Sequence, residues 1–134
     1  MNPSNTTIFV SEFIGTALLL LLGIGVGCNQ SLKKSFGFGP NWLLTSIGWG
    51  FAVFVGASVS WKSGAQLNPA VTIALTMSDS NPQGWDVVPV YITAQVLGAM
   101  CGAVLAYLLY KKQFDTNGDN TNTGGLFYTS ASVP

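Results

Sequence analysis

Residues 63–75 read SGAQLNPAVTIAL, and this stretch decides the fold. Asn68 is a favourable helix N-cap and Pro69 a favourable first helical residue, so a helix is predicted to begin here. The sequence turns polar at Ser78, which limits the helix to about 69–77. At ~1.5 Å per residue, roughly nine residues span less than half of a ~30 Å hydrocarbon core. The stretch therefore predicts an apolar half-helix that is too short to cross a membrane.

The backbone before this half-helix is expected to be irregular. Membrane proteins tolerate irregular backbone at membrane depth only where it is buried in protein or lines a wet cavity. Its unpaired carbonyl oxygens would then face a pore as a row of hydrogen-bond acceptors, followed by the Asn68 amide as a donor. The predicted pore-lining residues are Gly64, Ala65, Gln66, Leu67, Asn68, Pro69 and Ala70.

Three longer apolar stretches surround the half-helix, over about 8–28, 41–61 and 89–110. Each contains about the 20 residues that a transmembrane helix needs. A cleaved signal peptide is a poor alternative for the first stretch, because no positive residue precedes it and it is long for such a segment. The sequence from Gln113 onward, DTNGDNTNTGG included, predicts a solvated loop over 113–134. We therefore expect an all-α membrane protein.

The composition supports a membrane protein and excludes several other classes. Only 7% of the 134 residues are charged, whereas ~25% is usual in soluble domains. The net charge is zero and no basic run occurs, so no nucleic-acid partner is expected. There is no histidine, and no nucleophile, base or metal cluster stands out, so neither an enzyme nor a metal or cofactor site is predicted. Cys28 and Cys101 lie in apolar stretches, which favours buried filler over a disulfide.

Small residues recur at every fourth position in the predicted spans. Such stripes let helix backbones approach closely inside a membrane, so they predict helix-packing faces. The stripes are Gly23 and Gly27 in the first span, Gly48, Ala52, Gly56 and Ser60 in the second, and Ala94, Gly98, Gly102 and Ala106 in the third.

The chain resembles the major intrinsic proteins, the aquaporins and glycerol-conducting aquaglyceroporins. The resemblance centres on SGAQLNPAVTIAL, whose NPA is the signature box of that family, and it is strongest to the glycerol uptake facilitator branch. It implies three transmembrane helices plus one re-entrant half-helix, which is one inverted repeat of the aquaporin fold and the N-terminal half (1–134) of such a channel. The implied function is passive passage of glycerol, other small neutral solutes and water across a lipid bilayer.

The resemblance also suggests roles for individual residues. Trp49 matches the position at which aquaglyceroporins place a pore-lining tryptophan, although a Trp that packs against lipid or another helix is the alternative. Gln66 stands where the family usually has histidine, so only its backbone role carries over. Glu12 matches a buried glutamate that supports the loop before the half-helix. From the residues alone, a proton-relay carboxylate is an equal reading of Glu12, but no second acidic residue lies inside a span. Gln95 matches a helix-packing position.

Complete members of the family carry a second repeat with its own NPA box and a following arginine, and they form homotetramers. Neither the second box nor that arginine occurs in these 134 residues. Three accounts remain open: a fragment of a glycerol channel, half of a split channel that needs its second half, and a truncated product that conducts nothing. A water-selective aquaporin is the alternative to a glycerol channel.

The orientation in the cell membrane is predicted differently by two arguments. Lysine counting places the pairs at 33–34 and 111–112 in the cytoplasm, because only Lys62 lies on the other side. The family arrangement places the N-terminus and residues 78–86 in the cytoplasm instead. We follow the family arrangement, which gives a multi-pass protein with a cytoplasmic N-terminus.

Overall fold

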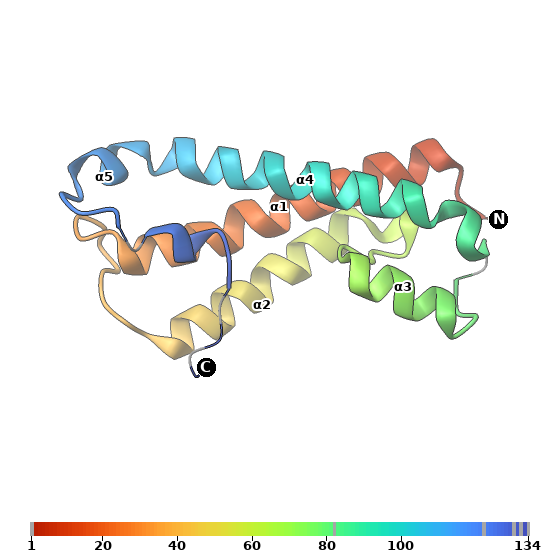
Figure 1. Cartoon of the computed structure of the whole chain (residues 1–134), viewed down its shortest axis with the longest axis horizontal. Coiled ribbons are helices and arrows are strands. Elements are labelled where there is room, and N and C mark those ends of the chain that lie inside the picture. The colour runs from red at the N-terminus through yellow and green to blue at the C-terminus, as the bar shows by residue number, and fades with distance from the viewer. Residues whose placement is uncertain (1, 82, 122, 130, 132, 134) are drawn as a thin grey trace.

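The computed structural model describes residues 2–81, 83–121, 123–129, 131 and 133, and this part of the chain is helical without a strand. Figure 1 shows the arrangement of its elements. In chain order these are α1 (Asn5–Ser31), α2 (Trp42–Val59), the 3-10 turn η1 (Trp61–Ser63), α3 (Pro69–Met77), η2 (Gly84–Val87), α4 (Val88–Leu109), α5 (Lys111–Thr116) and η3 (Thr123–Leu126).

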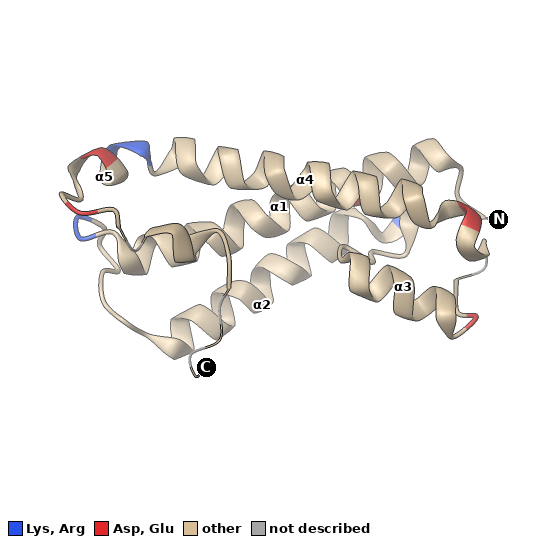
Figure 2. Ribbon diagram, in the orientation of Figure 1, with Lys and Arg blue, Asp and Glu red and all other residues tan. Residues whose placement is uncertain are grey.

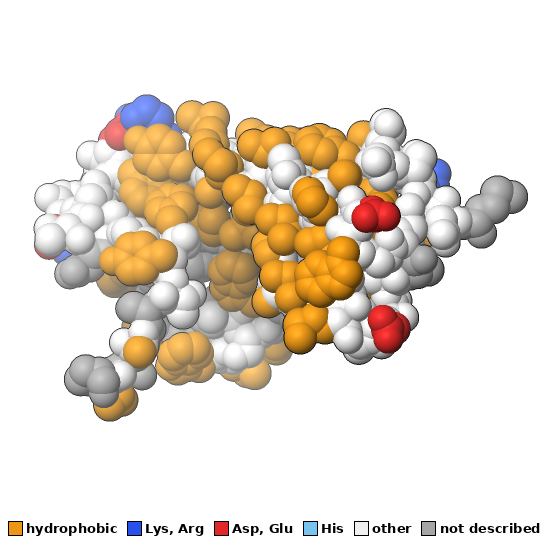
Figure 3. All heavy atoms as spheres, turned by 45° about the vertical axis from the view of Figure 1, so that its right-hand side comes forward, with side chains coloured by type: hydrophobic (Ala, Val, Ile, Leu, Met, Phe, Trp, Pro, Cys, Tyr) orange, Lys and Arg blue, Asp and Glu red, His pale blue; other side chains and the backbone are white. Residues whose placement is uncertain are grey.

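The bundle has two ends that recur below. One end holds the N-terminus, η1 and the end of α3, and we call it the α3 end. The other holds the α1–α2 loop, α5 and η3, and we call it the α5 end (Figure 1). Apart from the buried Glu12, the charged residues lie towards these two ends (Figure 2), and apolar side chains cover much of the surface between them (Figure 3).

Three helical segments of the described chain are long and apolar enough to cross a membrane: Asn5–Ser31, Trp42–Val59 and Gly84–Leu109. The prediction of three spanning helices is therefore confirmed. The first helix begins earlier than predicted because Ser4 caps it, its Oγ accepting a hydrogen bond from the Thr7 N–H at 3.2 Å. The third begins earlier because η2 leads directly into α4.

Helices α1 and α4 lie side by side, and small residues bring them together (Figure 1). A Cβ added at Gly98 would overlap the Phe13 carbonyl oxygen, and one at Gly102 would overlap that of Ala17. The predicted packing face of α4 is therefore confirmed, since all four of its small residues are buried. Helix α2 meets α1 similarly, where a Cβ at Gly56 would lie 2.7 Å from the carbonyl oxygen of Gly15.

Helix α3 is the predicted half-helix, and it runs from Pro69 to Met77. The Asn68 side chain caps it by accepting a hydrogen bond from the Ala70 N–H at 2.9 Å. At ~1.5 Å per residue this helix covers less than half of a hydrocarbon core. The predicted fold class, three long helices with one half-helix, is confirmed.

The α5 end differs from the solvated loop that the sequence predicts over 113–134. Phe114 is only 6% exposed and joins an apolar cluster with Ile24 of α1 and Leu32, which caps the C-terminus of α1. The Asn117 Oδ1 accepts a hydrogen bond from the Lys33 N–H at 3.0 Å. The expectation of a segment without a core is wrong for these residues, because one aromatic ring and one amide suffice to dock it.

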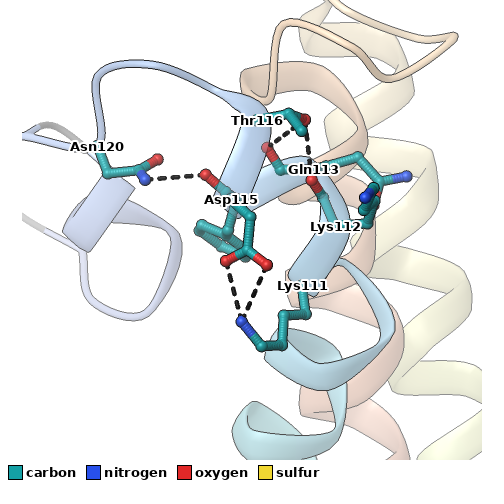
Figure 4. A network of polar contacts seen from close by, with 7 residues as sticks. Lys111, Lys112, Gln113, Asp115, Thr116 and Asn120 are labelled. Atoms are coloured by element: carbon teal, nitrogen blue, oxygen red, sulfur yellow. Dashed lines mark hydrogen bonds and ion pairs between the residues drawn. The ribbon is translucent and has the colours of Figure 1, made fainter.

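A polar network orders the same end (Figure 4). Lys111 Nζ lies 2.9 Å from Asp115 Oδ1, and this hydrogen bond raises the pKa of the Lys111 amine above its ordinary value. The Asn120 side chain donates to the Phe114 carbonyl at 3.0 Å. Together with the Lys33 contact, the network places both lysine pairs at one end of the bundle, as the sequence predicts.

Both cysteines are free. Cys28 is fully buried in the apolar cluster, and Cys101 is half-buried on α4. The prediction of buried filler is confirmed for Cys28.

Candidate functional site

The chain between η1 and α3 has an unusual backbone. Gly64, Ala65 and Leu67 have φ angles of 90°, 53° and 56°, in the left-handed region. For residues other than glycine this conformation costs on the order of 1–3 kcal/mol each, so the surroundings must hold it in place. The loop is therefore a strained segment that needs support from neighbouring helices.

Glu12 of α1 supplies that support. It is fully buried, and its carboxylate accepts four hydrogen bonds. Its Oε1 accepts from the Ser63 hydroxyl at 2.6 Å and the Gln66 N–H at 3.0 Å. Its Oε2 accepts from the Leu67 N–H at 2.7 Å and the Gln95 amide at 2.9 Å. One carboxylate thus joins α1, the loop and α4.

Gln95 of α4 extends this network to the half-helix. Its Nε2 also donates to the Thr72 hydroxyl at 3.0 Å. The Thr72 hydroxyl lies 3.2 Å from the carbonyl oxygen of Asn68, to which it donates. A chain of hydrogen bonds therefore leads from Glu12 through α4 to the residue that caps α3.

Sequence reasoning missed three residues of this network. Ser63 lies inside the quoted stretch but was not singled out, and Thr72 stands four residues after Asn68, which could have marked it. Tyr91 is 2% exposed and donates its hydroxyl to the Ser63 carbonyl. Only the tertiary packing of α4 against η1 brings Tyr91 there, so no local sequence signal identifies it.

A cavity of about 500 Å³ opens beside the loop and the first turn of α3. The predicted residues Ala65, Gln66, Leu67, Asn68 and Pro69 line it, together with Thr16, Gln95 and aliphatic side chains of α1, α2, α3 and α4. Its wall is therefore mostly apolar with a few convergent polar groups, which is the usual character of a small-molecule site.

Several polar side chains beside the cavity have buried oxygens without a hydrogen-bond partner among the described residues. In the described part of the chain, four buried side-chain oxygens lack a hydrogen-bond partner. Three of them belong to residues that line this cavity: Thr16 Oγ1, Gln66 Oε1 and Gln95 Oε1. Buried polar groups without a partner are uncommon and require an explanation, such as a ligand or a water molecule.

The backbone of the loop also has carbonyl oxygens without a hydrogen-bond partner in the described part of the chain. The carbonyl oxygens of residues 64–67 accept no hydrogen bond from any residue that the structure describes. The Asn68 side chain uses its oxygen for the helix cap and is exposed beside them, which leaves its amide nitrogen as a donor. The residues that line the cavity thus carry carbonyl oxygens and one amide nitrogen that other described residues leave free.

A second cavity of about 260 Å³ lies at the α3 end of the same loop. Its lining includes Lys62, Gly64 and Tyr91. Gln66 lines both cavities, and its side chain is only 9% exposed. The predicted residue Gly64 therefore belongs to this second cavity.

Two predicted pore residues lie away from the main cavity. Trp49 is half-buried, and its indole ring packs against Gly23 of α1, where an added Cβ would overlap it. Ala70 is exposed and contributes its N–H to the cap on Asn68. The structure thus gives Trp49 a helix-packing contact, and its role in a pore stays a prediction.

The comparisons with known proteins agree with this architecture. The family model for major intrinsic proteins matches residues 2–132. The glycerol uptake facilitator of Bacillus subtilis is 44% identical, over 96% of this chain and 46% of that protein. The probable glycerol uptake facilitator of Thermotoga maritima is 41% identical, over 95% of this chain and 54% of the relative.

A solved structure shows the same fold. The aquaglyceroporin of Plasmodium falciparum is 39% identical with a TM-score of 0.77, covering 84% of this chain and 45% of that one. The chain spans about half the length of the curated relatives it matches. These relatives are channel proteins and not enzymes, which agrees with the sequence prediction. On both the sequence match and the helical architecture, the chain belongs to the major intrinsic protein family.

Proposed function

We propose that this chain forms half of a membrane pore that conducts glycerol, other small neutral solutes and water. The observation that carries the proposal is a mostly apolar cavity lined by the loop residues Ala65, Gln66 and Leu67 and by Asn68 at the N-terminus of α3. The opposite, aliphatic part of the wall suits the carbon atoms of a polyol. The names of the relatives, glycerol uptake facilitators, support glycerol as a solute.

The geometry favours neutral solutes over cations. A helix N-terminus carries roughly half a positive charge, and α3 directs its N-terminus at the cavity. A cation at this point would meet like charge, whereas a hydroxyl group can accept from Asn68 and donate to a neighbouring oxygen. We propose that Asn68 donates a hydrogen bond to the passing solute. Ala65 and Gln66 then accept hydrogen bonds from the solute as it moves through the cavity.

The complete channel is expected to pass glycerol as well as water. The reason is the amphipathic wall, whose oxygens replace the hydration of a hydroxyl group while its aliphatic side chains contact carbon. Stopped-flow swelling of proteoliposomes that contain this half assembled with a second half measures both fluxes. Glycerol flux should exceed that of empty liposomes by more than about tenfold, whereas a monovalent cation should give no current.

A matched variant tests the cavity itself. Val53→Trp would fill the cavity from its aliphatic side, without touching the Glu12 network, and should reduce glycerol flux more than water flux. Phe54 is exposed on the neighbouring face of α2, which would contact lipid, so Phe54→Trp serves as the control. Fast water flux with glycerol flux at the level of empty liposomes would instead identify a water-selective pore.

We also propose that the N-terminus and the α3 end face the cytoplasm. A cysteine at the exposed Thr121, with Cys28 and Cys101 replaced, should react with an impermeant thiol reagent added to intact cells. A cysteine at the exposed Ser80, at the α3 end, should react only after lysis. The reverse pattern would show that lysine counting gives the correct orientation and would invert every loop.

The assembly of the complete channel is part of the same proposal. The cavity lies open on one side of the four helices, which suits a second inverted repeat as its cover. Helix α2 exposes Ile47, Phe51 and Phe54 on an apolar face that would contact lipid or another subunit. The homotetramer that the family resemblance implies stays a prediction.

A further inference from the structure

We propose that Gln95 is the positioning residue of the half-helix: its single amide nitrogen fixes the rotation of α3 by joining it to Glu12. The proposal rests on the function proposed above only in taking α3 to line the pore. It concerns how the helix is held, and it extends the general packing role predicted for this residue.

The geometry of the amide carries the proposal. Gln95 is 1% exposed, and its Nε2 donates to Glu12 Oε2 at 2.9 Å and to Thr72 Oγ1 at 3.0 Å. A primary amide has two N–H groups, and both are used here. The amide therefore cannot rotate by 180° without losing two hydrogen bonds. Its Oε1 is buried and has no hydrogen-bond partner among the described residues.

The two bonds hold different parts of the site. Glu12 controls the loop, because it binds the N–H groups of Gln66 and Leu67. Thr72 belongs to the first turn of α3 and donates to the Asn68 carbonyl. Among the described residues, the hydrogen bond between Gln95 and Thr72 is the one side-chain hydrogen bond that joins α3 to a spanning helix.

Other residue types would not reproduce this link. An ionised glutamate has no donor, methionine has the same length but no polar hydrogen, and asparagine is one methylene shorter. Any of them leaves Glu12 Oε2 with one donor fewer and Thr72 without its contact to α4. The half-helix is then free to turn about its axis, and Asn68 turns with it.

Amide hydrogen exchange of the 134-residue chain in detergent tests this without any transport measurement. Gln95→Met should accelerate exchange of the Gln66, Leu67 and Thr72 N–H groups about tenfold, the factor expected on losing one hydrogen bond to a charged group. Amides in the middle of α2 should keep their rates. Gln30→Met removes the same amide at the α5 end, where Gln30 bonds Asn41 and Thr45, and should leave the site unchanged.

Two further variants separate positioning from packing. Thr72→Val keeps the shape but loses the hydroxyl, so exchange should rise at Thr72 while Gln66 and Leu67 stay protected by Glu12. Thr72→Ser keeps the hydroxyl and should restore wild-type rates. Adding Thr72→Val to Gln95→Met should have no further effect at Thr72.

The proposal is overturned if Gln95→Met leaves the exchange of all three amides within twofold of the wild type. It is also overturned if Thr72→Val and Thr72→Ser behave alike. A complete channel that fails to conduct glycerol would refute the proposed function and leave these exchange results unaffected.

Discussion

Replacement of Glu12 by alanine is expected to prevent most of this chain from folding. The carboxylate accepts four hydrogen bonds in a fully buried position, from Ser63, Gln66, Leu67 and Gln95. Each buried donor left without a partner costs ~1–3 kcal/mol. The Ser63 hydroxyl can still donate to the Ser60 carbonyl at 2.8 Å, so three donors lose their partner. Their summed cost is a large part of the ~5–15 kcal/mol that stabilises a typical domain. The left-handed backbone of Ala65 and Leu67 would also lose the group that holds it.

The amount of monodisperse protein after size-exclusion chromatography in detergent measures this effect. Glu12→Gln keeps one acceptor oxygen and should fall between the wild type and Glu12→Ala. Asp86→Ala removes an exposed carboxylate at the α3 end and should give the wild-type amount. Equal amounts of Glu12→Ala and Asp86→Ala would show that the carboxylate does not support the loop.

The helices of this fold were predictable because the signals for them are local. Apolar length gives the three spans, and the Asn68–Pro69 pair followed by a polar stretch gives both ends of α3. The stripe of small residues on α4 predicted the face that meets α1, whereas Gly23 and Gly27 of α1 face Trp49 and Leu126 instead of α4. The docking of Phe114 and Asn117 was not predictable, because their partners lie in or just after the C-terminal part of α1, more than 80 residues earlier in the chain.

The loop residues of the site were predictable from the sequence, but most of the residues that hold the loop in place were not. The stretch at 63–75 supplied part of the cavity lining, Ala65 to Pro69, whereas Gly64 lines the second cavity and Ala70 lines neither. The family resemblance pointed to Glu12. Thr16 and Tyr91 carry no local signal, because their importance depends on which groups meet after the helices have packed. The spacing of Thr72 from Asn68 marks its cap contact, but not its hydrogen bond with Gln95. The contact of Trp49 with Gly23 likewise follows from the angle at which α2 crosses α1.

A protein made of these 134 residues alone is expected to conduct no glycerol, even when it inserts into a bilayer. The cavity, Asn68 and the free carbonyl oxygens of the loop open on a side that no described residue covers. In lipid, each unsatisfied backbone group costs several kcal/mol, so this side must be covered by another protein surface. Two copies in the same orientation cannot supply an inverted repeat, and the arginine that follows the second NPA box in complete members would still be missing.

Co-expression provides the test. Glycerol uptake should appear only when a second-half chain with its own NPA box and arginine is produced together with this one, and the increase should be at least about tenfold over either chain alone. Asn68→Asp should abolish it, because a carboxylate keeps the cap on Ala70 but removes the amide donor from the cavity. Thr45→Val, at the α5 end and outside both the Glu12 network and the cavity, serves as the control and should conduct normally. Glycerol-driven swelling by the purified 134-residue chain, lost in Asn68→Asp, would mean that a single repeat builds a pore.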